Sequence, residues 1–333
     1  MKKLIFLVAL ILCAAVLMTA CGPGEDGVVT LSAGNNRSAE DPSSLALFLL
    51  AERAYELSDG TLNIEVFIAS QTGSAITQLE ALSLGSQAIY HGGGTWISNY
   101  VPDRAVASLF FLFDNEEHFL RYLRHPDLGA YADERFREEL GIIMLGHGRY
   151  SMAAPRSMVA NVPIHSLSDF EGLRFRTPDI RAFFESFDAL GVSPVQLALG
   201  EVYLGLLQGT VDGTCAPFDG LYTMNFFEAA PYVLITDHAF DNYPFMINEN
   251  IFNSLSDSHR EALLQATYEA TLFFNAKNIE MRYIYMERMV ERGATIIHID
   301  REEFAAATQA RMRELEAEGL WRQGLIEEIL ALR

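Results

Sequence analysis

The side chains with the clearest chemical potential in this sequence are arginines near predicted strand ends. Residues 173–176 alternate between apolar and charged side chains, which predicts a half-buried strand ending at Arg176. A guanidinium keeps its charge and presents a planar fork of N–H donors that matches a carboxylate. Arg176 is therefore a candidate anion ligand; the alternative is a solvated charge at a strand end. Arg174 is expected to point to the opposite face and not to reach the same anion.

The segments after Arg176 predict the framework that positions it. Apolar residues recur at helical spacing over 179–190, residues 195–199 form an apolar strand, and residues 201–208 form a short helix. A third strand starts at Val211 and ends in a turn at residues 212–213. This order of strands and helices predicts a parallel α/β unit, in which ligands bind beyond the carboxyl ends of strands.

Three small residues, Thr214, Cys215 and Ala216, follow the third predicted strand and so lie at such an end, as Arg176 does. Cys13 and Cys21 belong to the N-terminal segment described below, which leaves Cys215 without a partner for a disulfide framework. A lone cysteine of this kind is most often a small buried apolar residue.

Composition limits the classes of function. The chain has 333 residues, of which 50% are hydrophobic, which is enough to bury a large core in two lobes. The formal net charge of −20 argues against nucleic acids and anionic membrane surfaces as partners. An anion site in this chain must therefore be local and built from particular arginines.

The N-terminus has the pattern of a targeting segment. Lys2 and Lys3 precede an apolar run over residues 4–17, which is short for a transmembrane span. Residues 1–20 are expected to be a signal peptide. Small residues before Cys21 predict a lipobox, with Cys21 lipidated and residues 21–27 forming a tether; the alternative is an ordinary signal peptide with an incidental cysteine.

Motifs that would indicate an enzyme or a metal protein are incomplete. Residues 91–94 read HGGG, as in an esterase oxyanion hole, but no Gly-x-Ser-x-Gly elbow follows. Residues 146–149 read GHGR and lack the remaining glycine and the lysine of a phosphate loop. His238 has no cysteine or histidine at metal-binding spacing. We therefore expect no catalysis, no cofactor and no metal.

Other segments predict helices and core. Residues 116–123 form a helix with His118 on its solvated side, and the phenylalanines of 110–113 belong to the core. Capping boxes are expected at Ser168 with Glu171, and at Ser258 with Glu261. Residues 258–292 contain neither glycine nor proline, which predicts a helix about 50 Å long.

Four stretches together resemble the extracytoplasmic solute-binding proteins of TRAP transporters, the DctP-like family. Residues 169–176 read DFEGLRFR, residues 191–194 read GVSP, residues 200–203 read GEVY, and residues 211–217 read VDGTCAP. They follow the family pattern in type and spacing. The match weakens where the family has Glu-Asn and this chain has Cys215 and Ala216.

The resemblance implies an α/β, two-lobed, periplasmic-binding-protein-like fold with a long interlobe helix. Lobe I would comprise residues 28–153 with about 242–280, and lobe II residues 154–241 with about 281–333. The implied function is capture of a small organic acid outside the cytoplasm, in the periplasm or at the outer cell surface, for TRAP membrane permease subunits. Two alternatives are a binding protein for an ABC importer or sensor, and an exported enzyme.

The resemblance also implies the ligand contacts. Counting back twenty residues from Arg176 gives Arg156 as a second carboxylate ligand, with Arg149 as a competitor for that role. Asn36, the backbone near Gly93, and residues 214–218, which include Phe218, would complete the pocket. Asp237 either faces the pocket or caps a turn.

Two departures from the family pattern bear on ligand choice. Ala216 replaces an asparagine, and Leu199 stands where an aromatic residue is common. The pocket is therefore expected to be less polar at this corner and to prefer a bulkier or more apolar acid than C4-dicarboxylates.

Overall fold

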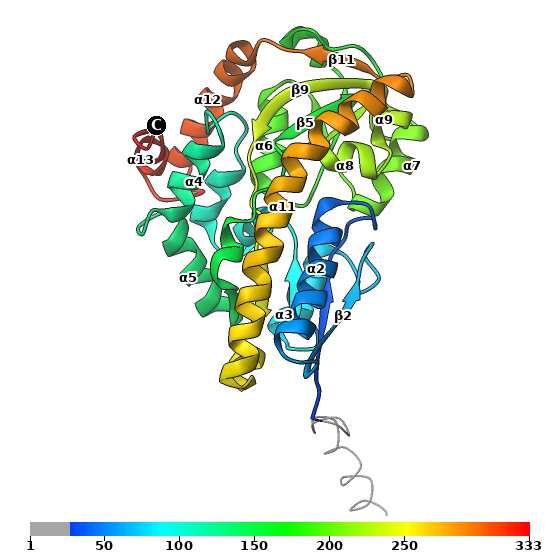
Figure 1. Cartoon of the computed structure of the whole chain (residues 1–333). Coiled ribbons are helices and arrows are strands. Elements are labelled where there is room, and N and C mark those ends of the chain that lie inside the picture. The colour runs from blue at the N-terminus through cyan, green and yellow to red at the C-terminus, as the bar shows by residue number, and fades with distance from the viewer. Residues whose placement is uncertain (1–26) are drawn as a thin grey trace, which may run out of the picture.

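The computed structural model describes residues 27–333 and contains two β-sheets (Figure 1). The first sheet has the strand order β2-β1-β3-β10-β4, with β1 (Val29–Gly34), β2 (Leu62–Phe67), β3 (Ile89–His91), β4 (Ile142–Met144) and β10 (Phe245–Asn248). The second has the order β11-β9-β5-β8-β6-β7, with β5 (Arg156–Ala160), β6 (Arg174–Thr177), β7 (Ser193–Gln196), β8 (Gly213–Pro217), β9 (Tyr232–Ala239) and β11 (Thr295–His298). Each sheet is the centre of one lobe, so the two-lobed α/β fold is confirmed.

Helices pack around these sheets. They are α2 (Pro42–Leu57), α3 (Ala75–Ser83), α4 (Glu116–Arg124), α5 (Gly129–Leu140), α6 (Arg181–Ala189), α7 (Val202–Leu207), α8 (Phe218–Thr223), α9 (Phe226–Ala229), α10 (Glu249–Ser254), α11 (Asp257–Glu291), α12 (Arg301–Ala317) and α13 (Leu325–Leu330). Short 3₁₀ helices occupy Gly94–Asn99, Pro102–Ser108, Gly146–Tyr150, Leu167–Phe170 and Leu199–Glu201. No helix within residues 27–333 combines the length and apolar character needed to cross a membrane.

The long helix α11 joins the two lobes, as the sequence predicted. Its first half packs Leu263 and Phe274 into the core around β1 and α2. Its second half packs Tyr285 and Met289 into the core of the second sheet. Figure 1 shows α11 running along the length of the molecule beside α2. The residue boundaries given above for the two lobes remain a prediction.

The cap of α11 differs from the prediction. The Ser256 side chain, not Ser258, accepts the hydrogen bond from the backbone N–H of His259. The cap therefore lies two residues earlier than predicted, and the helix starts at Asp257. It ends before Gly293, whose φ of 95° is a left-handed conformation that glycine adopts without steric cost.

The other predicted capping box is also displaced. Ser166 and Asp169, instead of Ser168 and Glu171, form the reciprocal box, and they cap a 3₁₀ helix. The Asp169 carboxylate accepts hydrogen bonds from the backbone N–H groups of His165 and Ser166, and these bonds lower its pKa. Glu171 lies at the other end of the same 3₁₀ helix, as its C-cap.

The parallel unit predicted after Arg176 is confirmed, with β6 parallel to both β7 and β8. Its third strand was placed too early: β8 begins at Gly213 and contains Thr214, Cys215 and Ala216. Gly213 belongs in the strand because it pairs with Ala160 of β5 and Phe175 of β6, and the ring of Phe175 leaves no room for a side chain: a Cβ atom there would lie 2.4 Å from that ring.

The prediction for His118 was wrong. Its side chain is fully buried, the backbone N–H of Asp114 donates to Nδ1, and Nε2 bonds to the carbonyl of Ile329 in α13 at 2.8 Å. The phenylalanines at 110, 111 and 113 are buried in the core, as predicted.

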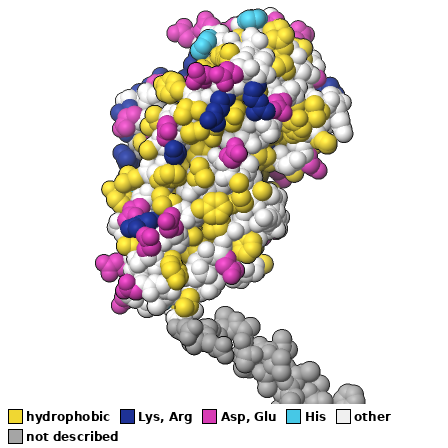
Figure 2. Space-filling model, turned by 45° about the vertical axis from the view of Figure 1, so that its right-hand side comes forward, with side chains coloured by type: hydrophobic (Ala, Val, Ile, Leu, Met, Phe, Trp, Pro, Cys, Tyr) yellow, Lys and Arg dark blue, Asp and Glu magenta, His cyan; other side chains and the backbone are white. Residues whose placement is uncertain are grey.

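Charged side chains are spread over the surface. Figure 2 shows acidic and basic side chains interspersed with apolar ones on one face, rather than gathered in a single field. The net charge of −20 therefore does not prevent a locally basic site.

Candidate functional site

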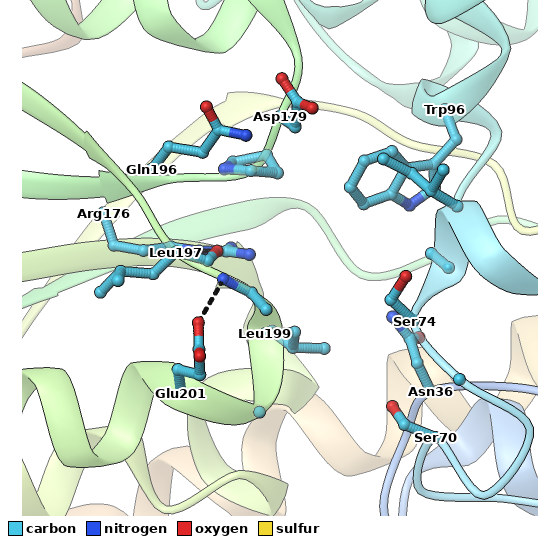
Figure 3. A pocket seen from close by; sticks show the side chains of 16 residues that line it. Asn36, Ser70, Ser74, Trp96, Arg176, Asp179, Gln196, Leu197, Leu199 and Glu201 are labelled. Carbon is cyan, nitrogen blue, oxygen red and sulfur yellow. Dashed lines mark hydrogen bonds between the residues drawn. The ribbon is translucent and has the colours of Figure 1, made fainter.

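A cavity of about 620 Å³ lies between the two lobes. Figure 3 shows Asn36, Ser70, Ser74 and Trp96 on one wall, from the first lobe. The opposite wall comes from the second lobe, with Arg176 and the residues that follow β6 and β7. The carboxyl ends of β6 and β7 meet at this wall, and Arg176 lines it, whereas Thr214, Cys215 and Ala216, to which the strand-end rule was also applied, do not line this cavity.

Arg176 is the central charged group of this cavity. It is only 4% exposed, and its Nε donates to the carbonyl of Leu197 at 2.9 Å. Burial lowers the pKa of Arg176 to about 10, and the nearby charges of Arg156 and Arg37 act in the same direction. Among residues 27–333, no carboxylate forms an ion pair with it.

Arg156 lies behind Arg176 at the start of β5. Its Nη2 donates to the carbonyl of Cys215 at 3.2 Å, and its guanidinium lies 4.7 Å from the ring centre of Phe183. Its Nε is buried without a partner. The charge of Arg156 also opposes the rise in the pKa of Asp241, which burial brings to about 6. Arg156 thus acts on a buried acid, whereas Arg176 forms no ion pair within residues 27–333, although the carboxylates of Asp179 and Glu201 line the same cavity (Figure 3).

Arg174 points away from the cavity, but not for the reason expected from sequence. Residues two apart in a strand share a face, so facing cannot separate Arg174 from Arg176. Position along the strand does: Arg174 begins β6 at the exposed end and forms two hydrogen bonds at 3.0 Å with the carboxylate of Asp212. Arg149 does not line the cavity. Its charge instead opposes the rise in the pKa of Asp133 that burial causes.

The other predicted site residues occupy several places. Asn36 lines the cavity opposite Arg176. Gly93 lies against Asp241, since a Cβ atom there would be 3.0 Å from Oδ2. Thr214, with an unpartnered hydroxyl, is buried in β8 next to Cys215. Phe218 begins α8, and its ring lies beneath the guanidinium of Arg282 at 5.3 Å.

Asp237 lies away from this cavity. Its carboxylate accepts from Nη2 of Arg282 in α11 at 2.8 Å and lines a second cavity of about 470 Å³ beside that helix. Its φ of 42° marks an irregular point in β9, where the register against β5 shifts. Asp237 therefore pairs with an arginine of α11 and does not line the interlobe cavity; no helix is capped by its side chain within residues 27–333.

The buried histidines have structural environments. His91 stacks on Phe245 with ring centres 3.8 Å apart, and burial lowers its pKa to about 3. Burial also lowers the pKa of His238 well below its usual value. Both imidazoles are therefore neutral in the core. Within residues 27–333 no cluster of three potential metal ligands occurs.

Sequence reasoning missed Arg37, which is as buried as Arg176. It lies in the polar turn after β1, and its Nη2 donates to the hydroxyl of Tyr243. Burial alone would lower the pKa of Arg37, but Tyr243 and the carboxylates of Asp41 and Asp219 raise it above its usual value. A signal was present in the sequence, because residue 37 follows the carboxyl end of a strand, but only the neighbouring Asn36 was predicted to contact the ligand there.

Comparisons with known proteins agree with this architecture. A solute-binding protein of Roseobacter denitrificans is 24% identical over 90% of both chains. The sialic acid-binding periplasmic protein SiaP of Vibrio cholerae is 24% identical over 82% of this chain and 88% of its own. A TRAP periplasmic solute-binding protein of R. denitrificans, solved with bound β-D-glucuronate, superposes with a TM-score of 0.83 at 25% identity, covering 91% of this chain and 99% of that one.

The family model for bacterial extracellular solute-binding protein, family 7, matches residues 33–318. This match covers most of the chain and includes all four stretches that carried the resemblance. The chain therefore belongs to family 7 of the bacterial extracellular solute-binding proteins, the solute-binding proteins of TRAP transporters.

Proposed function

We propose that the interlobe cavity binds the carboxylate of a small organic acid through Arg176, with Arg156 adding positive charge behind it, for delivery to TRAP permease subunits. The observation that carries the proposal is a buried guanidinium that lines the cavity without an acidic partner. An unpaired buried charge is costly, and an incoming carboxylate would compensate it with charge-assisted hydrogen bonds. Closure of the lobes would strengthen this pair by excluding water.

The surroundings of Arg176 favour an acid that also carries polar groups. Asn36, Ser70 and Ser74 face it across the cavity and can hydrogen-bond to a neutral part of a ligand (Figure 3). Trp96 adds an apolar surface to the same wall. The ligands named for two of the related proteins, sialic acid and glucuronate, are both carboxylates with several hydroxyl groups. Family membership favours a TRAP system over an ABC importer or a sensor, and a binding protein over an enzyme.

Thermal-shift screening followed by titration calorimetry tests this function. The purified protein is unfolded and refolded to remove bound ligand, then screened against organic acids, neutral sugars and amino acids. Ligand at about 100 times its Kd adds about 2.7 kcal/mol of stability, a visible rise in Tm. We expect stabilisation by acids only, lost in Arg176→Met and retained in Arg174→Met, the matched control on the same strand. Stabilisation by neutral sugars alone would refute the arginine–carboxylate pairing.

We also propose that the protein is exported as a lipoprotein anchored at Cys21, with residues 1–20 as its signal peptide. Cys21 lies outside the described residues, so the support is the sequence pattern together with the extracellular family. In the native host, the protein should fractionate with membranes, and Cys21→Ser should move it to the soluble exported fraction. Membrane association that persists in Cys21→Ser would contradict the lipid anchor.

A further inference from the structure

One arginine and two acids are the charged residues that line the interlobe cavity. Within residues 27–333 no other charged side chain lines it besides Arg176, Asp179 and Glu201. In Figure 3, Arg176 lies between the two acids, with Asp179 towards one edge of the drawn cavity and Glu201 towards the other. A ligand whose carboxylate pairs with Arg176 therefore meets no second cation in the lining, and the remaining charges are negative.

Two further arginines lie close to Arg176 but outside the lining. Burial lowers the pKa of Arg176, and the charges of Arg156 and Arg37 act in the same direction, yet neither of these residues lines the cavity. Each has a buried acid in its own surroundings, Asp241 for Arg156 and Asp41 for Arg37. Their charges are therefore partly balanced within the core, and Arg176 is the cation that a ligand reaches.

Asp179 offers a carboxylate without a protein partner. It is exposed, and within residues 27–333 its side chain forms no hydrogen bond and no ion pair. Its backbone carbonyl accepts from Nδ2 of Asn99 at 3.2 Å, and Asn99 belongs to the 3₁₀ helix Gly94–Asn99 of the first lobe. This contact across the lobe interface holds Asp179 at the cavity, where its carboxylate oxygens are open to a donor from a ligand.

Glu201, in contrast, is engaged by its own segment. Its Oε2 accepts from the backbone N–H of Ala198 at 3.1 Å, the dashed line in Figure 3. Glu201 also belongs to the stretch GEVY, which follows the family pattern, whereas Asp179 lies outside the four stretches that carry the resemblance. Of the two acids, Asp179 is therefore the one that neither a capping bond nor the family pattern explains.

A second negative group on the ligand would be repelled in this cavity. A carboxylate only accepts hydrogen bonds, so it gains none from Asp179 or Glu201, whereas a hydroxyl donates to either. Like charges a few ångströms apart at a partly exposed site lower affinity by about tenfold. A hydroxyl in place of the second carboxylate avoids this repulsion and gains a hydrogen bond to a charged acceptor.

We propose that Asp179, with Glu201 adding to its charge, makes the interlobe cavity selective for hydroxylated monocarboxylic acids over dicarboxylic acids. This inference rests on the proposed function, because it assumes that Arg176 binds one carboxylate of the ligand. A hydroxyl elsewhere on the ligand donates to Asp179, and a second carboxylate is excluded by charge. Selection against C4-dicarboxylates was also expected from Ala216 and Leu199, but there the reason was an apolar corner.

Pairs of acids that differ only in the second carboxylate test this selectivity. The probes are D-gluconate with D-glucarate, and 4-hydroxybutanoate with succinate, titrated into the refolded full-length protein by calorimetry. If another monocarboxylate from the screen binds more tightly, the diacid made by oxidising its terminal hydroxymethyl group is added. The wild-type protein should bind the monocarboxylate of each pair about tenfold more tightly. The ratio should shrink between about 0.01 M and about 1 M salt, because the Debye length falls from about 30 Å to about 3 Å.

The variants separate the charge of Asp179 from other effects. Asp179→Asn keeps the size of the side chain and should bring the two acids of a pair to within about threefold of each other. Glu201→Gln keeps an acceptor for Ala198 and should change the ratio less. Asp188→Asn is the matched control, because Asp188 is an exposed acid of α6 in the same lobe that does not line the cavity. It lowers the net charge equally and should leave the ratio unchanged, whereas Arg176→Met should weaken both acids.

Each outcome bears on one of the two proposals. Equal or tighter binding of the dicarboxylates by the wild-type protein would overturn the selectivity. So would a preference for monocarboxylates that persists in the double variant Asp179→Asn, Glu201→Gln, or one that Asp188→Asn reduces as much as Asp179→Asn does. All three results would leave the binding of acids by Arg176 intact. Binding of no acid of either kind would refute the proposed function itself, and the selectivity with it.

Discussion

Replacing Arg176 by methionine should affect binding and stability in opposite directions. Methionine keeps an unbranched apolar stem of similar reach and removes the charge. If Arg176 awaits the carboxylate of a ligand, the ligand-free protein carries the cost of a buried, unpaired guanidinium. Arg176→Met should therefore bind acids more weakly and, without ligand, should resist unfolding better than the wild-type protein.

The size of the stability effect follows from the environment of the guanidinium. Its pKa is lowered from 12.5 to about 10, and a difference of about 2.5 corresponds to a cost of about 3 kcal/mol for the charged form. The substitution also removes the hydrogen bond from Nε to the carbonyl of Leu197, a loss of about 1 kcal/mol. The net expectation is a gain of about 2 kcal/mol in the ligand-free protein. Breaking the ion pair with a bound acid should lower affinity about a hundredfold or more.

Urea unfolding of refolded, ligand-free protein measures the first effect, and calorimetric titration with a bound acid measures the second. Arg174→Met is the control, because its exposed pair with Asp212 contributes about 0–1 kcal/mol and touches no ligand. The wild-type protein, Arg176→Met and Arg174→Met are compared at the same pH and salt. A clear loss of stability in Arg176→Met, together with unchanged affinity, would show that Arg176 is a structural residue with partners of its own.

Two further predictions concern buried titratable groups. The folded protein holds a proton on Asp219 that the unfolded chain releases above about pH 4. Stability should therefore fall as pH rises from about 4 to about 8, by up to about 1.4 kcal/mol per pH unit. In Asp219→Asn this part of the slope should disappear, and an unchanged pH profile of the urea midpoint would contradict the prediction. His118→Ala should lower the free energy of unfolding by about 2–4 kcal/mol and expose α13 to proteolysis, because it removes a buried ring and its bond to the carbonyl of Ile329, whereas the exposed His165→Ala should do neither.

Local pattern was sufficient to predict most of the fold. Local sequence accounts for the start of α2, because Asp41 is a strong cap whose side chain accepts from the backbone N–H of Ser43, and because proline suits the first turn. The long helix α11 followed from the absence of glycine and proline over a stretch that glycine ends. Errors arose where several residues could serve as caps: Ser256 and Ser258 both suit the start of α11, and only the direction of the incoming chain decides between them.

Tertiary contacts explain the errors that pattern could not avoid. Gly213 has the sequence character of a turn residue, yet it lies in β8 because Phe175 covers its face. His118 has a polar side chain near the acidic start of α4, yet it is buried because α13, more than 200 residues later, covers it. Neither covering residue is a neighbour in sequence, so neither effect can be found from local spacing.

In the candidate site, too, local sequence located some side chains and not others. Arg176 and Asn36 both line the cavity, on opposite walls, where the strand-end argument and the family resemblance respectively had suggested ligand contacts. Asp237 also belongs to a strand that ends near the interface, but an irregular backbone at this residue directs its carboxylate to Arg282 in α11. The strand-end rule therefore identifies the edge of a sheet, whereas the face to which a side chain points depends on local backbone geometry.

Arg37 shows how a conclusion from one lobe can be reversed by the other. Considered alone, β8 and α8 present Ala216 and Gly220, two residues with almost no side chain, and the loss of an asparagine suggests an apolar corner. The small size of these residues is what admits the guanidinium of Arg37, whose Nη1 lies where a Cβ atom on Gly220 would interfere. A guanidinium from the first lobe therefore packs against the small residues of β8 and α8, so the residues of one lobe alone do not decide whether this region is polar or apolar.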